Sequence, residues 1–192
     1  MIIKDKEKLK QVCEPCESIE EGEKIGKLLF EHLARSKKGI GLAANQIGIN
    51  KRVCVINVTQ PVLLINPKIT KRSAEEFIFP EACLSFPGKY IKCKRNVEVT
   101  VEADNVDGEL FFSAADDMTK DKNEVFETAC VQHEIDHLDG ITMFDREFKQ
   151  EPIKVNKIGR NEKVTLTKGS ESKIIKFKKA QPLLEAGWIL QS

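Results

Sequence analysis

Two histidines four residues apart, His133 and His137, constrain this chain more than any other feature of its sequence. They lie in the segment V-Q-H-E-I-D-H-L-D-G, residues 131–140. On an α-helix, residues at this spacing share one face and lie one turn apart, so both imidazoles can bind one metal ion. Glu134 lies between them and can reach a water molecule on that metal. The alternative is a surface helix with two solvated histidines, and the pattern alone does not decide between the two.

The segment around these histidines has the pattern of a core helix. Asp121 followed by Glu124 resembles a capping box at its start, and Gly140 is suited to end it. The apolar side of the segment consists of Val125, Phe126, Ala129, Val131, Ile135 and Leu138. Polar side chains on a buried helix are destabilising unless they are paired or coordinate a metal, so this helix predicts a partnered polar site.

Length and composition indicate one ordinary domain with, at most, an appendage. The chain has 192 residues, of which 41% are hydrophobic and 32% charged, as in soluble globular proteins. No apolar run approaches the roughly 20 residues needed to span a bilayer, and residues 1–6 contain no apolar signal region. We therefore expect a cytoplasmic protein with no membrane partner.

Six cysteines occur at positions 13, 16, 54, 83, 93 and 130. A chain of this length can build a core without disulfides, and nothing in it indicates export. Cys54 and Cys130 have the apolar neighbours of small buried hydrophobic residues. The Cys13-x-x-Cys16 pair has no second pair at a zinc-binding spacing, so we interpret it as coincidental.

Charge is distributed unevenly along the chain. Residues 1–148 contain 21 Lys+Arg and 26 Asp+Glu, whereas residues 149–192 contain 10 and 4. The first part therefore has a net charge of −5 and the second a net charge of +6, which together give the +1 of the whole chain. The shift predicts a separate basic module at the C-terminus, an anionic partner for it, or both.

Residues 18–36 predict an amphipathic helix, because a Ser18-x-x-Glu21 capping box precedes leucines and isoleucines at helical spacing. The stretch G-I-G-L-A-A-N-Q-I-G, residues 39–48, follows it. Its small residues require close approach of the backbone to other groups, or else form a turn between helix and strand. It lacks the G-K-[ST] ending of a phosphate-binding loop.

The middle of the chain predicts short strands separated by turns rather than by helices. They are expected at residues 52–58, 62–66, 97–102 and 110–112, and residues 81–88 are expected to form a loop flanked by prolines. This order favours an α+β fold in which antiparallel sheets pack around the central histidine-bearing helix. We expect one domain at 1–148, which carries the histidine pair, and a basic extension at 149–192, with a hairpin at 163–167 and 174–178, a short helix at 182–186 and a strand at 188–190.

Three motifs, in this order, resemble those of the peptide deformylase family. G-I-G-L-A-A-N-Q (39–46) is similar to G-x-G-L-A-A-x-Q, E-A-C-L-S (81–85) to E-G-C-L-S, and Q-H-E-I-D-H (132–137) to H-E-x-D-H. The resemblance extends over about residues 2–147. It implies a hydrolase that removes the N-formyl group from the initiator methionine of nascent polypeptides and releases formate.

The resemblance also implies the roles of individual residues. Cys83, His133 and His137 would hold one metal ion and leave an open position for water. Glu134 would take a proton from that water and pass it to the leaving amine. The oxyanion would be stabilised by the metal, by the Gln46 side-chain amide and by the backbone N–H of Leu84.

The substrate-binding residues follow from the same resemblance. The methionine side chain would occupy an apolar pocket, and the backbone near Gly41 and Ala82 would pair with the extended peptide. The pocket residues are expected to be Ile40, Phe79, Phe126 and Ala129, which could equally be plain core. Ala82 replaces the usual glycine and is tolerated if its backbone is extended. An ion pair of Glu81 with Arg95 is expected to fix the Cys83 loop.

Several alternatives remain at this point. The ligands could bind Fe²⁺, Zn²⁺, Ni²⁺ or Co²⁺, and the resemblance favours Fe²⁺ in the cell. The basic extension could contact ribosomal RNA or be a solvated cap. There are two rival functions: a metallopeptidase built on the same histidine pair, and a binding protein that holds metal without catalysis. Intact Gln46, Cys83 and Glu134 argue against the second rival.

Overall fold

The computed structural model of the chain describes residues 1–36, 38–114, 122–149, 159–169 and 171–191. The chain forms two compact units, Met1–Phe148 and Lys149–Ser192, and each is described by itself. The division falls at the point where the net charge of the sequence changes sign.

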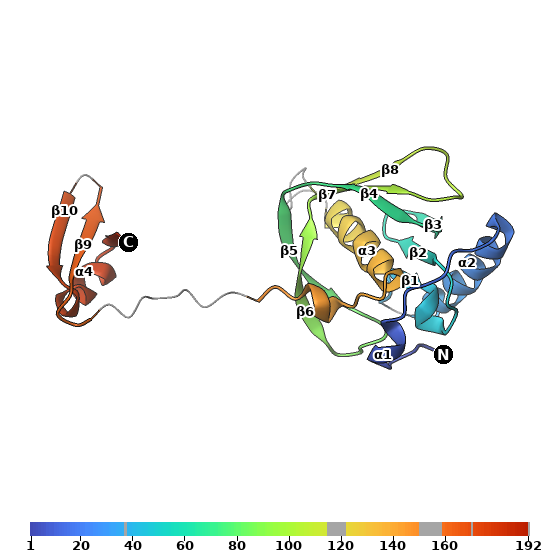
Figure 1. Cartoon of the computed structure of the whole chain (residues 1–192), viewed down its shortest axis with the longest axis horizontal. Coiled ribbons are helices and arrows are strands. Elements are labelled where there is room, and N and C mark those ends of the chain that lie inside the picture. Colours follow the sequence, from blue (N-terminus) through green and yellow to red (C-terminus); the bar gives the residue numbers. More distant parts are fainter. Residues whose placement is uncertain (37, 115–121, 150–158, 170, 192) are drawn as a thin grey trace. The chain divides into compact units, whose positions relative to one another are not determined.

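Three small antiparallel sheets form the framework of the first unit (Figure 1). The first contains β1 (Gly41–Ala43), β2 (Val53–Asn57) and β3 (Pro61–Ile65), the second contains β4 (Lys68–Arg72), β7 (Glu98–Glu102) and β8 (Leu110–Ser113), and the third pairs β5 (Glu76–Ala82) with β6 (Tyr90–Asn96). Every pairing is antiparallel. The predicted α+β class with antiparallel sheets is confirmed.

The helix that carries both histidines, α3 (Lys122–Leu138), lies among these sheets (Figure 1). It packs against β1, β2 and β8, and every residue from 128 to 138 is buried. Gly140 adopts a left-handed conformation with φ of 71° just after the helix, as a helix-ending glycine should. The expected cap at Asp121 lies outside the described residues.

The predicted N-terminal amphipathic helix is α2 (Ile19–Ala34), and the Ser18 Oγ accepts the Glu21 N–H at 3.2 Å as its cap. A Cβ at Gly22 would lie 2.6 Å from the Ile65 side chain, so the glycine lets the helix lie close to β3. Three shorter helical turns complete the unit: α1 (Lys6–Leu9), η1 (Ala44–Ile47) and η2 (Met143–Arg146).

The loop predicted at residues 81–88 begins later than expected. Glu81 and Ala82 are the last residues of β5, and Ala82 pairs with Tyr90 of β6. Pro80 lies inside β5, whose one paired neighbour among the described strands is β6, and a proline is compatible with such an edge strand. Two strands rich in lysine and arginine, β4 and β6, were also missed.

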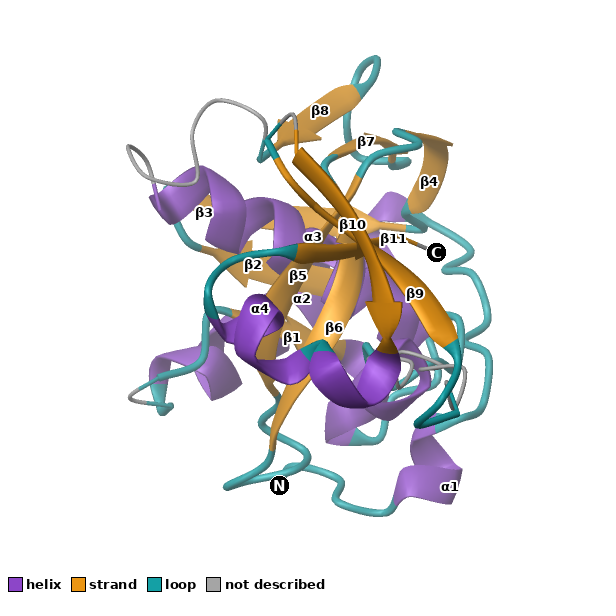
Figure 2. Ribbon diagram, turned by 90° about the vertical axis from the view of Figure 1, so that its left-hand side faces the viewer, coloured by secondary structure: helices purple, strands orange, loops and turns teal. Residues whose placement is uncertain are grey.

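The second unit is a three-stranded sheet with a short helix (Figure 2). Its elements are β9 (Lys163–Lys168), β10 (Glu171–Lys176), η3 (Phe177–Lys179), α4 (Gln181–Glu185) and β11 (Ile189–Gln191), with strand order β10-β9-β11. The second strand of the hairpin begins and ends earlier than the predicted 174–178. Val164, Leu166, Ala180 and Trp188 are its buried apolar residues.

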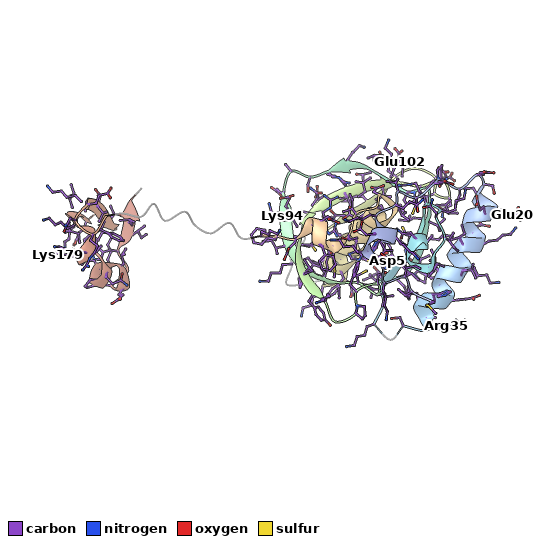
Figure 3. All side chains as sticks on the ribbon, turned by 60° about the horizontal axis from the view of Figure 1, so that its bottom comes forward. Asp5, Glu20, Arg35, Lys94, Glu102 and Lys179 are labelled. Atoms are coloured by element: carbon purple, nitrogen blue, oxygen red, sulfur yellow. The ribbon has the colours of Figure 1, made fainter. Side chains whose placement is uncertain are left out.

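Many charged side chains are exposed at the surface of each unit, as Glu20, Lys94 and Glu102 of the first unit and Lys179 of the second illustrate (Figure 3). Within the described ranges, no helix is both long enough and apolar enough to cross a membrane.

Candidate metal centre

Three side chains from different parts of the sequence meet at one face of α3. Cys83 follows β5 directly, whereas His133 and His137 belong to the helix. Their donor atoms all lie within 4.8 Å of one another, and the Cys83 Sγ lies 3.3 Å from the His137 Nε2. All three side chains are buried. The three ligands expected from the sequence therefore form one cluster.

The cluster fits a divalent metal ion. A tetrahedral ion with bonds of about 2.3 Å to sulfur and about 2.1 Å to nitrogen separates these atoms by roughly 3.6 Å, close to the 3.3 Å found. The electrostatics agree. Burial would lower the pKa of His133, but its hydrogen bonds to Cys83 and Glu81 outweigh burial and raise that pKa well above its usual value. These surroundings favour positive charge, which a bound cation would supply.

His133 is oriented by an ion pair behind it. Its Nδ1 lies 2.8 Å from the Glu81 Oε2, and the two Glu81 oxygens accept from the Arg95 Nε at 2.5 Å and Nη2 at 2.8 Å. Burial would raise the pKa of Glu81, but the hydrogen bonds from Arg95 and His133 outweigh it and lower the pKa to about 2. The expected Glu81–Arg95 pair is thus present, and it leaves the His133 Nε2 for a metal.

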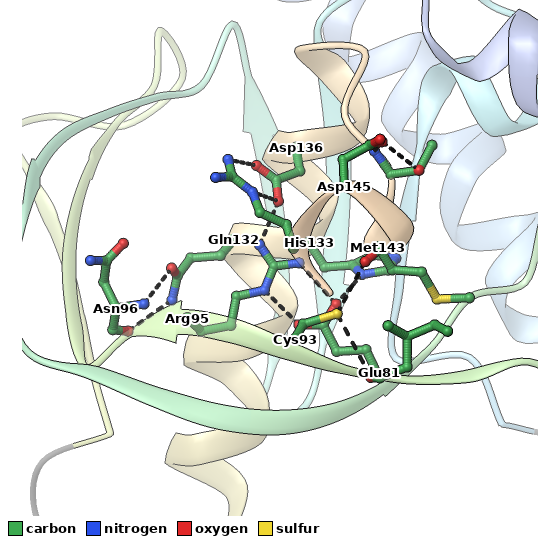
Figure 4. A network of polar contacts seen from close by, with 12 residues as sticks. Glu81, Cys93, Arg95, Asn96, Gln132, His133, Asp136, Met143 and Asp145 are labelled. Carbon is green, nitrogen blue, oxygen red and sulfur yellow. Dashed lines mark hydrogen bonds and ion pairs between the residues drawn. The ribbon is translucent and has the colours of Figure 1, made fainter. Parts of the chain in front are cut away.

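The same network extends to two residues that the sequence reasoning missed (Figure 4). Arg95 also donates to the Asp136 carboxylate, which accepts from the Arg146 Nε at 3.0 Å and Nη2 at 2.7 Å. The sequence did contain a signal for Asp136, because an acidic residue on a helix predicted to be buried needs polar partners. Arg146 is contributed by η2 and could not have been identified from local pattern.

His137 has a different environment from His133. Its backbone oxygen accepts from the Asn45 Nδ2 at 2.6 Å, which ties the end of α3 to η1. Its Nδ1 is buried and has no hydrogen-bond partner among the described residues. Burial lowers the pKa of His137 well below its usual value, so the imidazole is neutral, the form that binds metals.

Gln46 lies beside the cluster. Its Oε1 accepts the Ala43 N–H at 2.8 Å, which directs its Nε2 toward the Cys83 Sγ at 3.3 Å and the Ser85 Oγ at 3.1 Å. The amide is therefore fixed against the sulfur of a predicted ligand. Ser85 was not predicted as a site residue, although it closes the second motif.

Glu134 is a buried carboxyl group beside the ligand cluster. It is 4% exposed, and its Oε2 has no hydrogen-bond partner among the described residues. Burial raises its pKa to about 7. A Cβ at Gly41 would lie 2.5 Å from the Glu134 Oε1, so the close backbone approach expected of residues 39–48 makes room for this carboxyl group.

A cavity of about 400 Å³ opens onto the cluster. Its lining includes Cys83, His133, Glu134, Gln46 and Leu84 and every expected substrate-binding residue, namely Ile40, Gly41, Phe79, Ala82, Phe126 and Ala129. The Phe79 and Phe126 rings pack edge to face with centroids 5.0 Å apart. Cys130, which was expected only in the core, also lines the cavity.

Ala82 is extended, as expected for a tolerated alanine. It ends strand β5, and Asn66 is the one described non-glycine residue with positive φ. The departure from the usual glycine therefore introduces no backbone strain beside Cys83.

Comparison with known proteins adds an independent finding. The model of the polypeptide deformylase family matches residues 1–152. A peptide deformylase of Neisseria meningitidis serogroup B is 38% identical over 169 residues, covering 83% of this chain and 93% of the relative. One of Rhizobium meliloti is 37% identical over 145 residues, covering 71% and 78%.

Solved structures give the same result. The peptide deformylase of Thermotoga maritima superposes with a TM-score of 0.67 at 28% identity, covering 78% of this chain and 97% of that one. A Synechococcus elongatus peptide deformylase in complex with actinonin superposes with a TM-score of 0.66 at 29% identity, covering 78% and 79%. The motifs, the fold and these matches together show that this chain belongs to the polypeptide deformylase family.

Proposed function

We propose that this chain removes the N-formyl group from N-formylmethionine at the start of nascent polypeptides, releasing formate, and that Cys83, His133 and His137 hold its catalytic metal. The observation that carries the assignment of the site is the Glu134 carboxyl group, which is buried beside this ligand cluster and lines the cavity, and whose Oε2 has no hydrogen-bond partner among the described residues. A buried carboxyl group without a partner is unfavourable for folding and is expected where catalysis requires it.

The metal would supply a Lewis acid that activates water and polarises the formyl carbonyl. Glu134 takes the proton from the attacking water and delivers it to the leaving amine nitrogen, a role worth about 10²–10⁴-fold in rate. The carboxyl group is suited to it because burial places its pKa at about 7.

Gln46 and Leu84 stabilise the oxygen that gains negative charge. The Gln46 Nε2 faces the ligand cluster, and the Leu84 N–H donates to no described residue in the structure. Both groups are neutral donors, so they can stabilise an oxyanion without neutralising the Glu134 carboxylate. Ser85 and Ala43 hold the Gln46 amide in this orientation.

The methionine side chain packs against the apolar wall formed by Ile40, Phe79, Phe126 and Ala129, and the backbone at Gly41 and Ala82 pairs with the peptide. The edge position of β5 supports this arrangement, since β6 is its one partner among the described strands. Each well-placed methylene of the substrate contributes about 1–3 kcal/mol.

The metal in the cell is Fe²⁺ in this proposal, with Zn²⁺, Ni²⁺ and Co²⁺ as alternatives that the same thiolate and imidazole ligands accept. Metal analysis of protein purified without air, compared with reconstitution by each ion, tests the choice. Higher activity with Zn²⁺ than with Fe²⁺ would overturn it.

The second unit contacts the ribosome through RNA in this proposal. Its net charge of +6 over residues 149–192 supports an anionic partner. The strand register places Lys163 and Lys176 opposite each other on one face of its sheet. Replacing both by Glu should weaken ribosome co-sedimentation most at low salt, whereas Lys24→Glu with Lys27→Glu on α2 makes the same charge change in the first unit. Equal binding by both double variants would overturn the RNA contact.

Formate release from formyl-Met-Ala-Ser, with Fe²⁺ added under argon, tests the main function. Formate and free Met-Ala-Ser are the expected products. Cleavage of the peptide bond in unformylated Met-Ala-Ser, without formate release, would indicate a metallopeptidase instead. No reaction with one bound metal per chain would leave the binding-protein alternative.

A further inference from the structure

The mouth of the active-site cavity contains residues that the proposed chemistry does not use. The lining includes Lys38, which follows α2, and Pro87, Gly88 and Tyr90, which lie between β5 and the start of β6. Tyr90 is 72% exposed, so its ring offers an open surface at the rim. A peptide that has its formyl group at the metal ligands must leave the cavity past residues of this kind.

The charges that line the cavity differ in exposure. Glu81, His133 and Glu134 are buried, and Glu81 is paired with Arg95. Among the described charged side chains of this lining, Lys38 is the exposed one. No described carboxylate forms an ion pair with it. Among the described lining residues, Lys38 is therefore the positive charge that the rim presents to the part of the substrate beyond the formylmethionine.

We propose that Lys38 gives this site a preference for formylated peptides with an acidic residue at the second or third position. The inference rests on the proposed function and adds a substrate class to it. An extended peptide advances about 3.3 Å per residue, so the residues that follow the methionine reach the rim rather than the inner pocket.

The net charge of the first unit does not cancel this effect. Residues 1–148 carry a net charge of −5, which by itself disfavours acidic peptides. At physiological ionic strength the Debye length is about 8 Å, so charges spread over the surface are screened whereas a lysine adjacent to the bound peptide is not. The nearest charge therefore decides the preference.

The test compares amidated peptides, so that no C-terminal carboxylate reaches Lys38. The series is formyl-Met-Ala-X-amide and formyl-Met-X-Ala-amide, with Glu, Gln or Lys as X. Exposed charge pairs are worth a few-fold each, so we expect kcat/KM to be about five-fold higher for Glu than for Lys in at least one series. The difference should lie in KM, because the lysine contacts the peptide equally in the ground and transition states. The difference in KM between the Glu and Lys peptides should become smaller in 0.5 M salt, because salt screens the charge of Lys38.

Variants separate Lys38 from the net charge of the protein. Lys38→Gln should remove the preference and Lys38→Glu should reverse it. Lys27→Glu, an exposed lysine on α2 outside the cavity lining, makes the same change in net charge and should retain the preference. Equal kcat/KM for all three peptides, or an unchanged ratio in Lys38→Glu, would overturn the inference. Absence of formate from every peptide with metal bound would instead overturn the proposed function.

Discussion

The two units bury different kinds of side chain. The first unit buries Glu81, Arg95, Glu134 and Asp136 within its core, each no more than 5% exposed. In the second unit every described charged side chain is exposed, and the buried residues are apolar. Burying charge is costly without partners, so a chain does it where chemistry requires it. The first unit therefore has the buried charges expected of a reaction site, whereas the second buries apolar side chains and leaves its described charged side chains exposed.

The largest expected effect sharpens the catalytic side of this comparison. Glu134→Gln keeps the size of the side chain but removes its ability to accept a proton, so kcat/KM for formyl-Met-Ala-Ser should fall by about 10²–10⁴-fold. The variant should still bind one metal per chain, because Gln46 and the three ligands are unchanged. Formate release and metal content are the measurements. A variant as active as the parent would leave the mechanism without its base.

Two carboxylates of the same strand test whether the buried network differs from a surface pair. Glu81→Gln leaves Arg95 buried with one ionic partner fewer, which should cost about 3 kcal/mol in unfolding free energy and about 10–100-fold in metal affinity. Glu76→Gln breaks the exposed pair with Lys94, whose side chains are 46% and 50% exposed, and should cost less than about 1 kcal/mol. Denaturant unfolding and chelator competition measure both effects. Similar losses in the two variants would contradict the distinction.

Leu166→Ala tests whether the second unit folds independently of the reaction. Leu166 is fully buried there, and its truncation should cost about 2–5 kcal/mol, enough to unfold so small a unit. Trp188, the single tryptophan of the chain, lies in the same apolar cluster and reports this unfolding by fluorescence. Formate release should stay within about twofold of the parent if the units are independent. Leu138→Ala in the first unit should reduce formate release and leave the Trp188 fluorescence unchanged. Loss of formate release in Leu166→Ala would show that the two units are coupled.

The smallest expected effect comes from removing the second unit. A chain ending at residue 149 keeps every residue that lines the cavity, so its kcat/KM on a short formylated peptide should lie within about twofold of the parent. A tenfold loss would mean that the extension supports the site. Unchanged ribosome co-sedimentation of this shorter chain would remove the proposed role of the second unit.

Local pattern was enough to predict several elements of the fold and the common face of the two histidines. The spacing of His133 and His137 predicted their common face, and the capping box at Ser18 predicted the start of α2. The change of charge after residue 148 fell at the division between the two units. Such features depend on neighbours a few residues apart, so they can be read from the chain alone. Cys83 entered the prediction only through the family resemblance.

The tertiary structure decided which distant groups share the site. Strand pairing placed Glu81 in β5 against β6, so that Arg95 reached it, and η2 supplied Arg146 to Asp136. Packing of β1 on α3 placed Gly41 against the Glu134 carboxyl group. The sequence by itself determined the chemistry that each residue carries, because side-chain type and local spacing are written in it. Partners brought together across 10 to 93 positions depend on how all elements pack at once, which no local pattern records.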